Sequence, residues 1–147
     1  TLIGEGSSAG RWVRQAQRLG IADRVDWHGW MPQAKLLAIY GQHDVLLFPS
    51  LRDSGGMVVL EAMAQSLPVV CLDLGGPGVM VDEACGRVVA TKGRGARAVI
   101  AGLARALVEL ADDPALRKRL SQGAKERAHV FTWKAKVARI LAEAGNQ

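Results

Sequence analysis

The sequence predicts one α/β domain built on a doubly wound parallel sheet. Wholly apolar segments such as residues 45–48 and 68–72 alternate with stretches of helical periodicity. Strands without polar alternation are typical of parallel sheets whose two faces are covered by helices. The 147 residues fit one domain, and 49% hydrophobic with 22% charged residues excludes a disordered or collagen-like chain.

In the first two thirds of the chain, short strands and helices follow one another in order. The strands are brief apolar runs, expected at residues 2–3, 25–28, 45–48, 68–72 and 86–89. The helices have apolar residues at helical spacing or a proline at the first position, and are expected at residues 9–19, 32–40 and 56–66. The Gly-Gly-Pro-Gly segment at 75–78 predicts a tight loop before a short helix.

Beyond Thr91 the sequence indicates helices only. Residues 96–111 have helical spacing, and Asp113-Pro114 is the cap and first-turn signal of a second helix to about residue 129. Thr132 is expected to cap a third. We therefore expect a single domain over residues 1–147 whose C-terminal helices occupy 96–144.

Charge is distributed unevenly along the chain. Residues 1–91 carry seven basic and nine acidic residues, whereas residues 92–147 carry twelve basic and five acidic ones. A basic surface suits an anionic partner such as a membrane or a phosphorylated ligand, or it is simply a solvated set of helices. No DNA-binding motif or basic groove with interleaved aromatic residues accompanies it, so nucleic acid is not expected.

Cysteine content and hydropathy predict the compartment. Cys71 and Cys85 lie among apolar or small residues and are too few for a disulfide framework, so buried free thiols are expected. There is no signal-peptide pattern and no run of about 18 apolar residues. These features predict a cytoplasmic protein.

The segment from 49 to 64, PSLRDSGGMVVLEAMA, is the densest functional signal. It lies at the carboxyl end of a strand, where open α/β sheets bind ligands. The free N–H groups and dipole of a helix starting near Gly56 attract phosphate. Glu61 follows Asp53 by eight residues, so a ligand lying across the helix start can meet both carboxylates. The alternative is that Asp53 or Ser54 only caps the helix and that Glu61 is an exposed helical residue.

This segment resembles the donor-binding motif of retaining glycosyltransferases of the GT-B fold, family 4 type. Asp53 stands where the family has its first Glu, Glu61 stands at the second, and residues 54–56 replace Gly-Phe-Gly. The resemblance covers nearly the whole chain, with further landmarks at residues 4–6, 25–29, 44–50, 68–70, 75–76, 86–89, 113–114 and 131–133.

The resemblance implies a nucleoside diphosphate sugar as donor and assigns roles to residues. Glu61 binds the ribose hydroxyls and Asp53 contacts the donor sugar, which makes these two carboxylates the catalytic-site residues. The turn and helix start hold the diphosphate, through Ser54, Gly55, Gly56, Met57 and Val58. Backbone at Gly4 and Gly6 approaches the ligand, and the loop of Gly29, Trp30 and Met31 flanks the nucleobase. Trp30 is either a stacking platform for the base or a packed loop aromatic.

The resemblance also implies a reaction and missing parts. The parent enzyme transfers a sugar to an acceptor with retention of configuration, in bacterial-type glycan, polysaccharide or glycolipid synthesis. No metal is expected, because the chain has no Asp-x-Asp and His28, His43 and His129 lack metal-ligand spacing. The alternatives are an epimerase-type GT-B enzyme and a non-catalytic nucleotide-binding module.

Two parts of the family's enzymes lie outside this sequence: the acceptor-binding N-terminal domain, and the first strand and helix of the donor domain. The chain alone is therefore expected to bind donor weakly and to transfer nothing. In a doubly wound sheet the first strand lies between the second and fourth. We therefore expect a gap or a foreign strand between residues 1–4 and 44–49. The basic helices are expected to face an anionic membrane or solvent.

Overall fold

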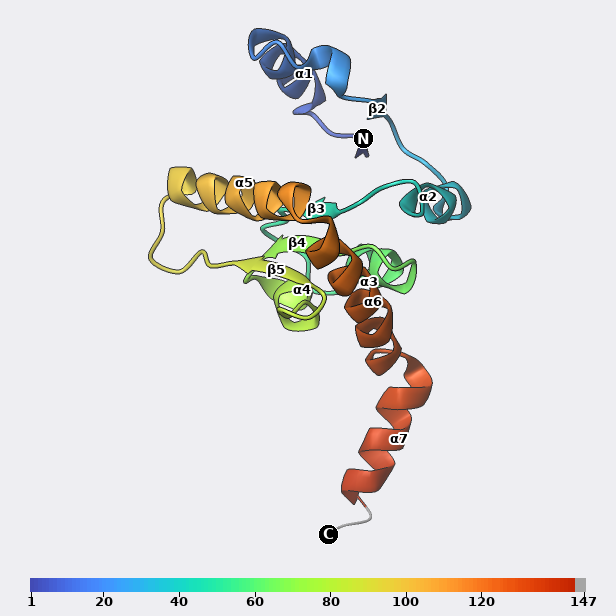
Figure 1. Cartoon of the computed structure of the whole chain (residues 1–147). Helices are drawn as coiled ribbons and strands as arrows, with labels where there is room; N and C mark the ends of the chain where they lie inside the picture. The colour runs from blue at the N-terminus through green and yellow to red at the C-terminus, as the bar shows by residue number, and fades with distance from the viewer. Residues whose placement is uncertain (145–147) are drawn as a thin grey trace. The chain divides into compact units, whose positions relative to one another are not determined.

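The computed structural model describes residues 1–144, and the chain divides into two compact units (Figure 1). The first is Thr1–Ala38 and the second begins at Ile39. The boundary falls within helix α2 (Gln33–Tyr40).

The first unit is a small α/β element built on two parallel strands. Leu2 of β1 pairs with Trp27 of β2, and Ile3 pairs with His28. A helix and a short 3-10 turn connect the strands, as parallel pairing requires a crossover. In chain order the elements are β1 (Leu2–Ile3), α1 (Ala9–Arg18), η1 (Ala22–Arg24), β2 (Trp27–His28) and then α2.

The second unit contains a three-stranded parallel sheet in the order β3-β4-β5. Leu46 pairs with Val69, and Val69 in turn pairs with Gly86. Its elements are β3 (Leu46–Phe48), α3 (Met57–Ala64), β4 (Val69–Leu72), α4 (Gly75–Met80), β5 (Gly86–Val89), α5 (Ala96–Asp112), α6 (Pro114–Val130) and α7 (Trp133–Ala144).

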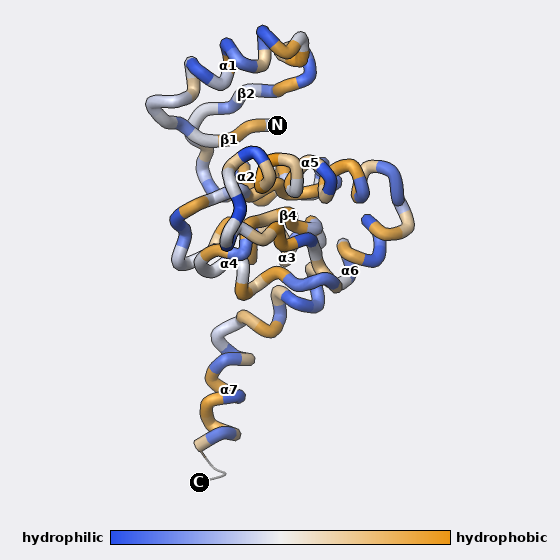
Figure 2. The backbone as a smooth tube through the Cα atoms, turned by 90° about the vertical axis from the view of Figure 1, so that its left-hand side faces the viewer, coloured by the Kyte–Doolittle hydropathy of each residue, from blue (hydrophilic) through white to orange (hydrophobic). Residues whose placement is uncertain are grey.

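The central strand β4 is buried on both of its faces. Successive side chains of a strand point to opposite faces. Val69 and Cys71 therefore join one apolar cluster with α3, α4 and α6, while Val70 joins another with Leu110 and Leu120. Figure 2 shows β4 as a strongly hydrophobic segment. The expectation of a parallel sheet covered on both faces is confirmed for this unit.

Each unit has its own hydrogen-bonded strands within residues 1–144: β1 pairs with β2 in the first unit, and β3, β4 and β5 pair in the second. The expectation of a gap or a foreign strand between residues 1–4 and 44–49 concerns strands of different units and stays a prediction. So does its explanation, an absent central strand.

The helix boundaries follow the sequence signals with one exception. The Asp113 carboxylate accepts the Leu116 N–H at 2.8 Å, and Thr132 Oγ1 accepts the Ala135 N–H at 3.3 Å, so both expected caps are confirmed. The tight loop expected at residues 75–78 is wrong: α4 already begins at Gly75. The close contact of these glycines with another segment, described below, accounts for the difference.

The two cysteines are free and wholly buried, as expected. Burial is the main cause that raises the pKa of each thiol to about 11. Because the thiolate is the reactive form, we predict that neither cysteine of the native protein reacts rapidly with an aromatic disulfide reagent at about pH 8, whereas both react once the chain is unfolded. Complete labelling of the native protein within seconds would contradict this prediction.

No helix in the described part of the chain combines the length and apolar character needed to cross a membrane.

Candidate functional site

The turn between β3 and α3 is held closed by the side chain of Asp53. One oxygen, Asp53 Oδ1, accepts the N–H groups of Gly55 at 2.9 Å and of Gly56 at 2.7 Å. The N-cap of α3 is Gly56, which has φ of +61° and no capping side chain. The alternative that Asp53 or Ser54 is the N-cap is therefore wrong. In this structure the Asp53 carboxylate is therefore hydrogen-bonded to two of the backbone N–H groups that the family resemblance assigns to the diphosphate.

The first turn of α4 lies directly against this turn. Gly76 donates its N–H to the Asp53 carbonyl oxygen at 3.0 Å. A Cβ on Gly75 would collide with that same oxygen, and Gly75 has φ of +57°. Only glycine permits this approach, which explains why the Gly-Gly segment is part of a helix rather than a free loop.

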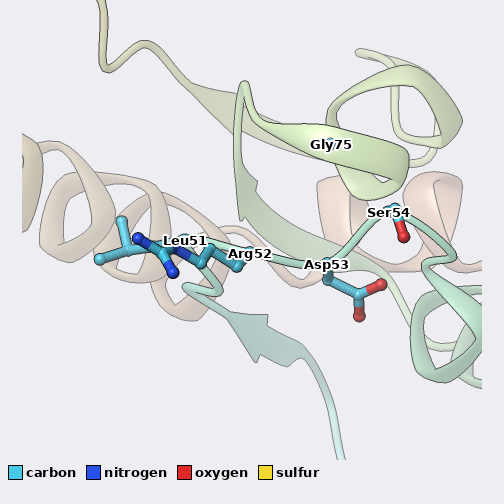
Figure 3. Close-up of a pocket in the computed structure, with 5 residues that line it drawn as sticks. All are labelled: Leu51, Arg52, Asp53, Ser54 and Gly75. Atoms are coloured by element: carbon cyan, nitrogen blue, oxygen red, sulfur yellow. The ribbon is translucent and has the colours of Figure 1, made fainter.

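An open pocket of about 350 Å³ lies beside the turn (Figure 3). Figure 3 shows the side chains of Leu51 and Arg52 directed away from the Asp53 carboxylate. Sequence reasoning did not single out Arg52, although it is the only cationic residue between positions 49 and 64. The pocket is lined by Leu51, Arg52, Asp53, Ser54 and Gly75.

Helix α3 presents its first-turn amides at the same place. Met57 and Val58 are its first two residues. N–H groups in the first turn of a helix have no acceptor within the helix, so they are available to a ligand. The structure thus brings the predicted residues from Asp53 to Val58 together in one turn and helix start.

Glu61 is half-buried one helical turn beyond Val58 and lies near the buried phenol of Tyr40. The alternative that it is an exposed helical residue is therefore wrong. Burial, followed by the negative charge of Glu61, raises the pKa of Tyr40 to about 12. The Tyr40 hydroxyl donates to the Val58 carbonyl oxygen at 3.5 Å. Sequence analysis missed Tyr40 as a site residue. It is the only tyrosine in the sequence, but no motif or residue spacing connects it with Glu61.

In the first unit, Glu5 joins the loops that follow β1 and β2. Glu5 Oε1 accepts the Trp30 N–H at 3.0 Å, and Gly4 donates its N–H to the Gly29 carbonyl oxygen at 3.2 Å. A Cβ on Gly29 would lie 2.9 Å from Glu5 Oε1, so the carboxylate reaches Trp30 only past a glycine. Sequence reasoning gave no role to Glu5.

A second pocket, of about 460 Å³, opens beside these loops. The Trp30 side chain is 73% exposed and does not line it, while Met31 is half-buried. Trp30 is thus accessible for stacking, and its role stays a prediction. The pocket includes the three predicted glycines and is lined by Leu2, Gly4, Glu5, Gly6, Ala9, Val13, Trp27, His28 and Gly29.

Asp73, at the carboxyl end of β4, is held by Thr91 after β5. Its Oδ1 accepts the Thr91 hydroxyl at 2.6 Å and the Thr91 N–H at 2.8 Å. The hydroxyl hydrogen bond is the main cause that lowers the pKa of Asp73 below its ordinary value of 3.8. A carboxyl whose pKa is lowered by folding stabilises the native state above its unfolded pKa, and this contribution is lost as the pH falls through the folded pKa.

We therefore predict that Asp73→Asn lowers the melting temperature at neutral pH, and that the difference from the wild type narrows as the pH falls below about 4. Asparagine keeps an acceptor oxygen, so the comparison isolates the charge. The exposed Asp112→Asn is the matched control. Thermal denaturation across this pH range is the measurement, and a difference that stays constant with pH would contradict the assignment.

The described residues contain no group of three or more His, Cys, Asp or Glu side chains placed to hold a metal ion.

Comparison with known proteins identifies the family. The family described as "Glycosyl transferases group 1" matches residues 1–127. D-inositol 3-phosphate glycosyltransferase of Corynebacterium glutamicum is 31% identical over 138 residues, covering 93% of this chain and 32% of that protein. This chain thus spans about a third of the length of that relative.

Solved structures agree with this match. Sucrose-phosphate synthase from Thermosynechococcus elongatus superposes with a TM-score of 0.76 at 28% identity, over 95% of this chain and 35% of that one. The C-terminal domain of a glycosyl transferase group 1 family protein from Francisella tularensis gives a TM-score of 0.64 at 19% identity, over 86% of this chain and 65% of that one. The chain has the fold of the C-terminal domain of GT-B glycosyltransferases and belongs to the glycosyl transferases group 1 family.

Proposed function

We propose that this chain is the donor-binding domain of an enzyme that moves a sugar from a nucleoside diphosphate sugar to an acceptor hydroxyl with retention of configuration. The observation that carries the proposal is the segment from Asp53 to Glu61, which combines backbone donors at a helix start with two carboxylates, Asp53 and Glu61. The family match over residues 1–127 supports it. Within this family we propose a hexosyltransferase of glycan, polysaccharide or glycolipid synthesis; the relative's name, D-inositol 3-phosphate glycosyltransferase, is compatible with this proposal.

The helix start of α3 binds the diphosphate in this proposal. The amides of Met57 and Val58 receive phosphate oxygens directly. The N–H groups of Gly55 and Gly56 donate to Asp53 Oδ1 in the structure. When the donor binds, they donate to phosphate oxygens instead. Asp53 is then free to accept hydroxyls of the donor sugar. The exchange replaces one anion by another at the same donors, so no amide loses its partner.

Glu61 accepts the two ribose hydroxyls, because an ionised carboxylate has two oxygens that accept hydrogen bonds from neighbouring donors. Tyr40 stays protonated at any physiological pH and fixes the first turn of α3 through the Val58 carbonyl. The roles that the family resemblance implies for Gly4, Gly6 and the loop of Gly29, Trp30 and Met31, with Trp30 as a stacking surface for the nucleobase, stay predictions.

In the transfer step the bond between the anomeric carbon and the diphosphate oxygen breaks, and negative charge develops on the departing nucleoside diphosphate. Backbone N–H groups aimed at that charge stabilise the transition state electrostatically. The proposed site requires no metal. An acceptor-binding domain outside this sequence supplies the acceptor, so the chain alone binds donor without transferring sugar.

Calorimetric titration of the chain with UDP, GDP and ADP, each with and without an attached sugar, tests the proposal. We expect one nucleoside diphosphate to bind measurably and its sugar conjugate to bind at the same site, with affinity unchanged by EDTA. No binding of any of the six ligands would overturn it. Binding followed by isomerisation of the sugar would instead favour an epimerase-type enzyme.

We also propose that α7 contacts an anionic membrane surface from the cytoplasmic side. Trp133 is 83% exposed, and the other large apolar residues of α7 are exposed as well. At about 100° per residue they form one stripe, with Lys134 and Lys136 at its two margins. Figure 2 shows the alternation of hydrophobic and hydrophilic segments along α7. The stripe consists of Trp133, Val137, Ile140 and Leu141.

Lysines on either side of an exposed apolar stripe are typical of helices that lie in the membrane interface. We expect the chain to sediment with vesicles that contain phosphatidylglycerol, less so at high salt, and not with neutral vesicles. Ile140→Glu should abolish sedimentation, with Ala142→Glu, which adds the same charge on the opposite face, as the control. Binding that is equal on neutral vesicles, or absent from both, would refute this contact.

A further inference from the structure

We propose that Arg127 of α6 is a positioning residue for the donor site, which it controls from a distance through helix α4. The inference rests on the proposed function, since it concerns the turn from Asp53 to Gly56. It also gives a role to one of the twelve basic residues between positions 92 and 147. Neither a solvated surface nor a membrane contact would require an arginine at position 127.

Arg127 holds the C-terminal end of α4. Its Nε donates to the Met80 carbonyl oxygen at 3.0 Å, and Nη2 donates to the Val79 carbonyl oxygen at 3.3 Å. Nε also lies 3.3 Å from Asp82 Oδ2, and the guanidinium stands 5.1 Å from the centroid of the Phe131 ring. The last carbonyls of a helix have no partner within it. Arg127 supplies that partner from another helix.

The chemistry of this contact suits arginine and no other side chain. The planar guanidinium has several N–H donors in a fixed fork, so it can bond two neighbouring carbonyls and a carboxylate at once. Its flat face is suited to stack on an aromatic ring such as Phe131. A lysine in the same place offers a single ammonium group and cannot reproduce the fork.

Helix α4 transmits this restraint because it is short and closely packed at both ends. It has six residues, from Gly75 to Met80. At its start, Gly76 donates to the Asp53 carbonyl, and a Cβ on it would lie 2.8 Å from the Ser54 carbonyl oxygen. At its end, the Met80 sulfur lies 2.7 Å from where a Cβ of Gly56 would stand.

Both ends of α4 therefore contact the turn from Asp53 to Gly56. If α4 moves, the Asp53 backbone and Gly56 lose the surface that holds them. Close-packed protein interiors have low compressibility, so they transmit such displacements. Arg127, which contacts no part of the turn in the described structure, thus fixes where the Gly55 and Gly56 amides point.

The test compares Arg127→Met with Arg119→Met, which removes the same charge from an exposed position on the same helix. Hydrogen exchange measured by NMR on the full chain follows the amides of Gly56 and Gly76, with the amide of Leu110 in α5 as a report on global unfolding. We expect Arg127→Met to speed exchange at Gly56 and Gly76 at least about tenfold relative to Leu110, and Arg119→Met to leave all three unchanged. Arg127→Lys should restore part of the protection.

Exchange at Gly56 and Gly76 that stays at the wild-type rate, or that rises by the same factor as at Leu110, would overturn the proposal. This readout needs no ligand, so it stands even if the donor assignment fails. A second measurement, the affinity for the nucleoside diphosphate that the wild type binds, should fall at least about fivefold in Arg127→Met and not in Arg119→Met. Unchanged affinity despite faster exchange would overturn the positioning role.

Discussion

Met63→Ala is expected to lower the free energy of unfolding by about 2–5 kcal/mol, as replacement of a large buried apolar residue by alanine generally does. Met63 is 0% exposed and belongs to the apolar cluster that joins α3 to β4 and α6, with Val59, Val69 and Ala124 among its members. The truncated side chain leaves a cavity that this close packing can fill only in part. Urea denaturation followed by circular dichroism is the measurement.

The matched control lies on the same helix. Met57→Ala removes the same atoms from a residue that is 62% exposed, and should change the unfolding free energy by no more than about 0.5 kcal/mol. Equal effects of the two substitutions would show that α3 does not pack on the sheet as described. A changed urea dependence of the unfolding free energy in Met63→Ala would indicate a change in the compactness of the native or denatured state, or loss of two-state unfolding.

The elements of this fold were readable from the sequence because each has a local cause. The wholly apolar run that ends at Leu72 predicts a strand buried on two faces, and Asp113-Pro114 predicts the start of α6 to the residue. The prediction of a loop at Gly75 was wrong because the conformation of this segment is decided by contact with the Asp53 backbone, some twenty residues earlier in the chain. Glycine and proline alone signal a turn, and no local pattern reveals that contact.

The candidate site likewise has parts that depend on local sequence and parts that depend on contacts between distant segments. The turn, the helix start and the spacing of Asp53 and Glu61 lie in one continuous segment, so sequence analysis found them together. The capture of the Gly55 and Gly56 amides by Asp53 depends on side-chain geometry that the sequence leaves open. Tyr40 and Arg127 reach α3 and α4 from elements far away in the chain, and spacing within a segment carries no information about such contacts.

Glu61→Ala is expected to weaken binding of the preferred nucleoside diphosphate by a factor of about ten to one hundred and fifty, which corresponds to roughly 1.5–3 kcal/mol for charge-assisted hydrogen bonds. Glu61 sits half-buried in α3 beside Tyr40, within the helix whose first turn receives the diphosphate. The loss should be the same with and without an attached sugar, because the ribose belongs to the nucleotide. Glu83→Ala, at an exposed position outside the turn, is the control.

A second variant separates the ribose contact from a general effect on α3. Glu61→Gln keeps one acceptor oxygen but loses the charge, and should bind with intermediate affinity if the carboxylate accepts ribose hydroxyls. The 2′-deoxy nucleotide provides the complementary deletion on the ligand, and it should bind the wild type more weakly. Glu61→Ala should cost this ligand less affinity than it costs the intact nucleotide, because the hydrogen bond of the 2′-hydroxyl is already missing. If instead the two losses add in full, Glu61 acts on the diphosphate turn and not on the ribose.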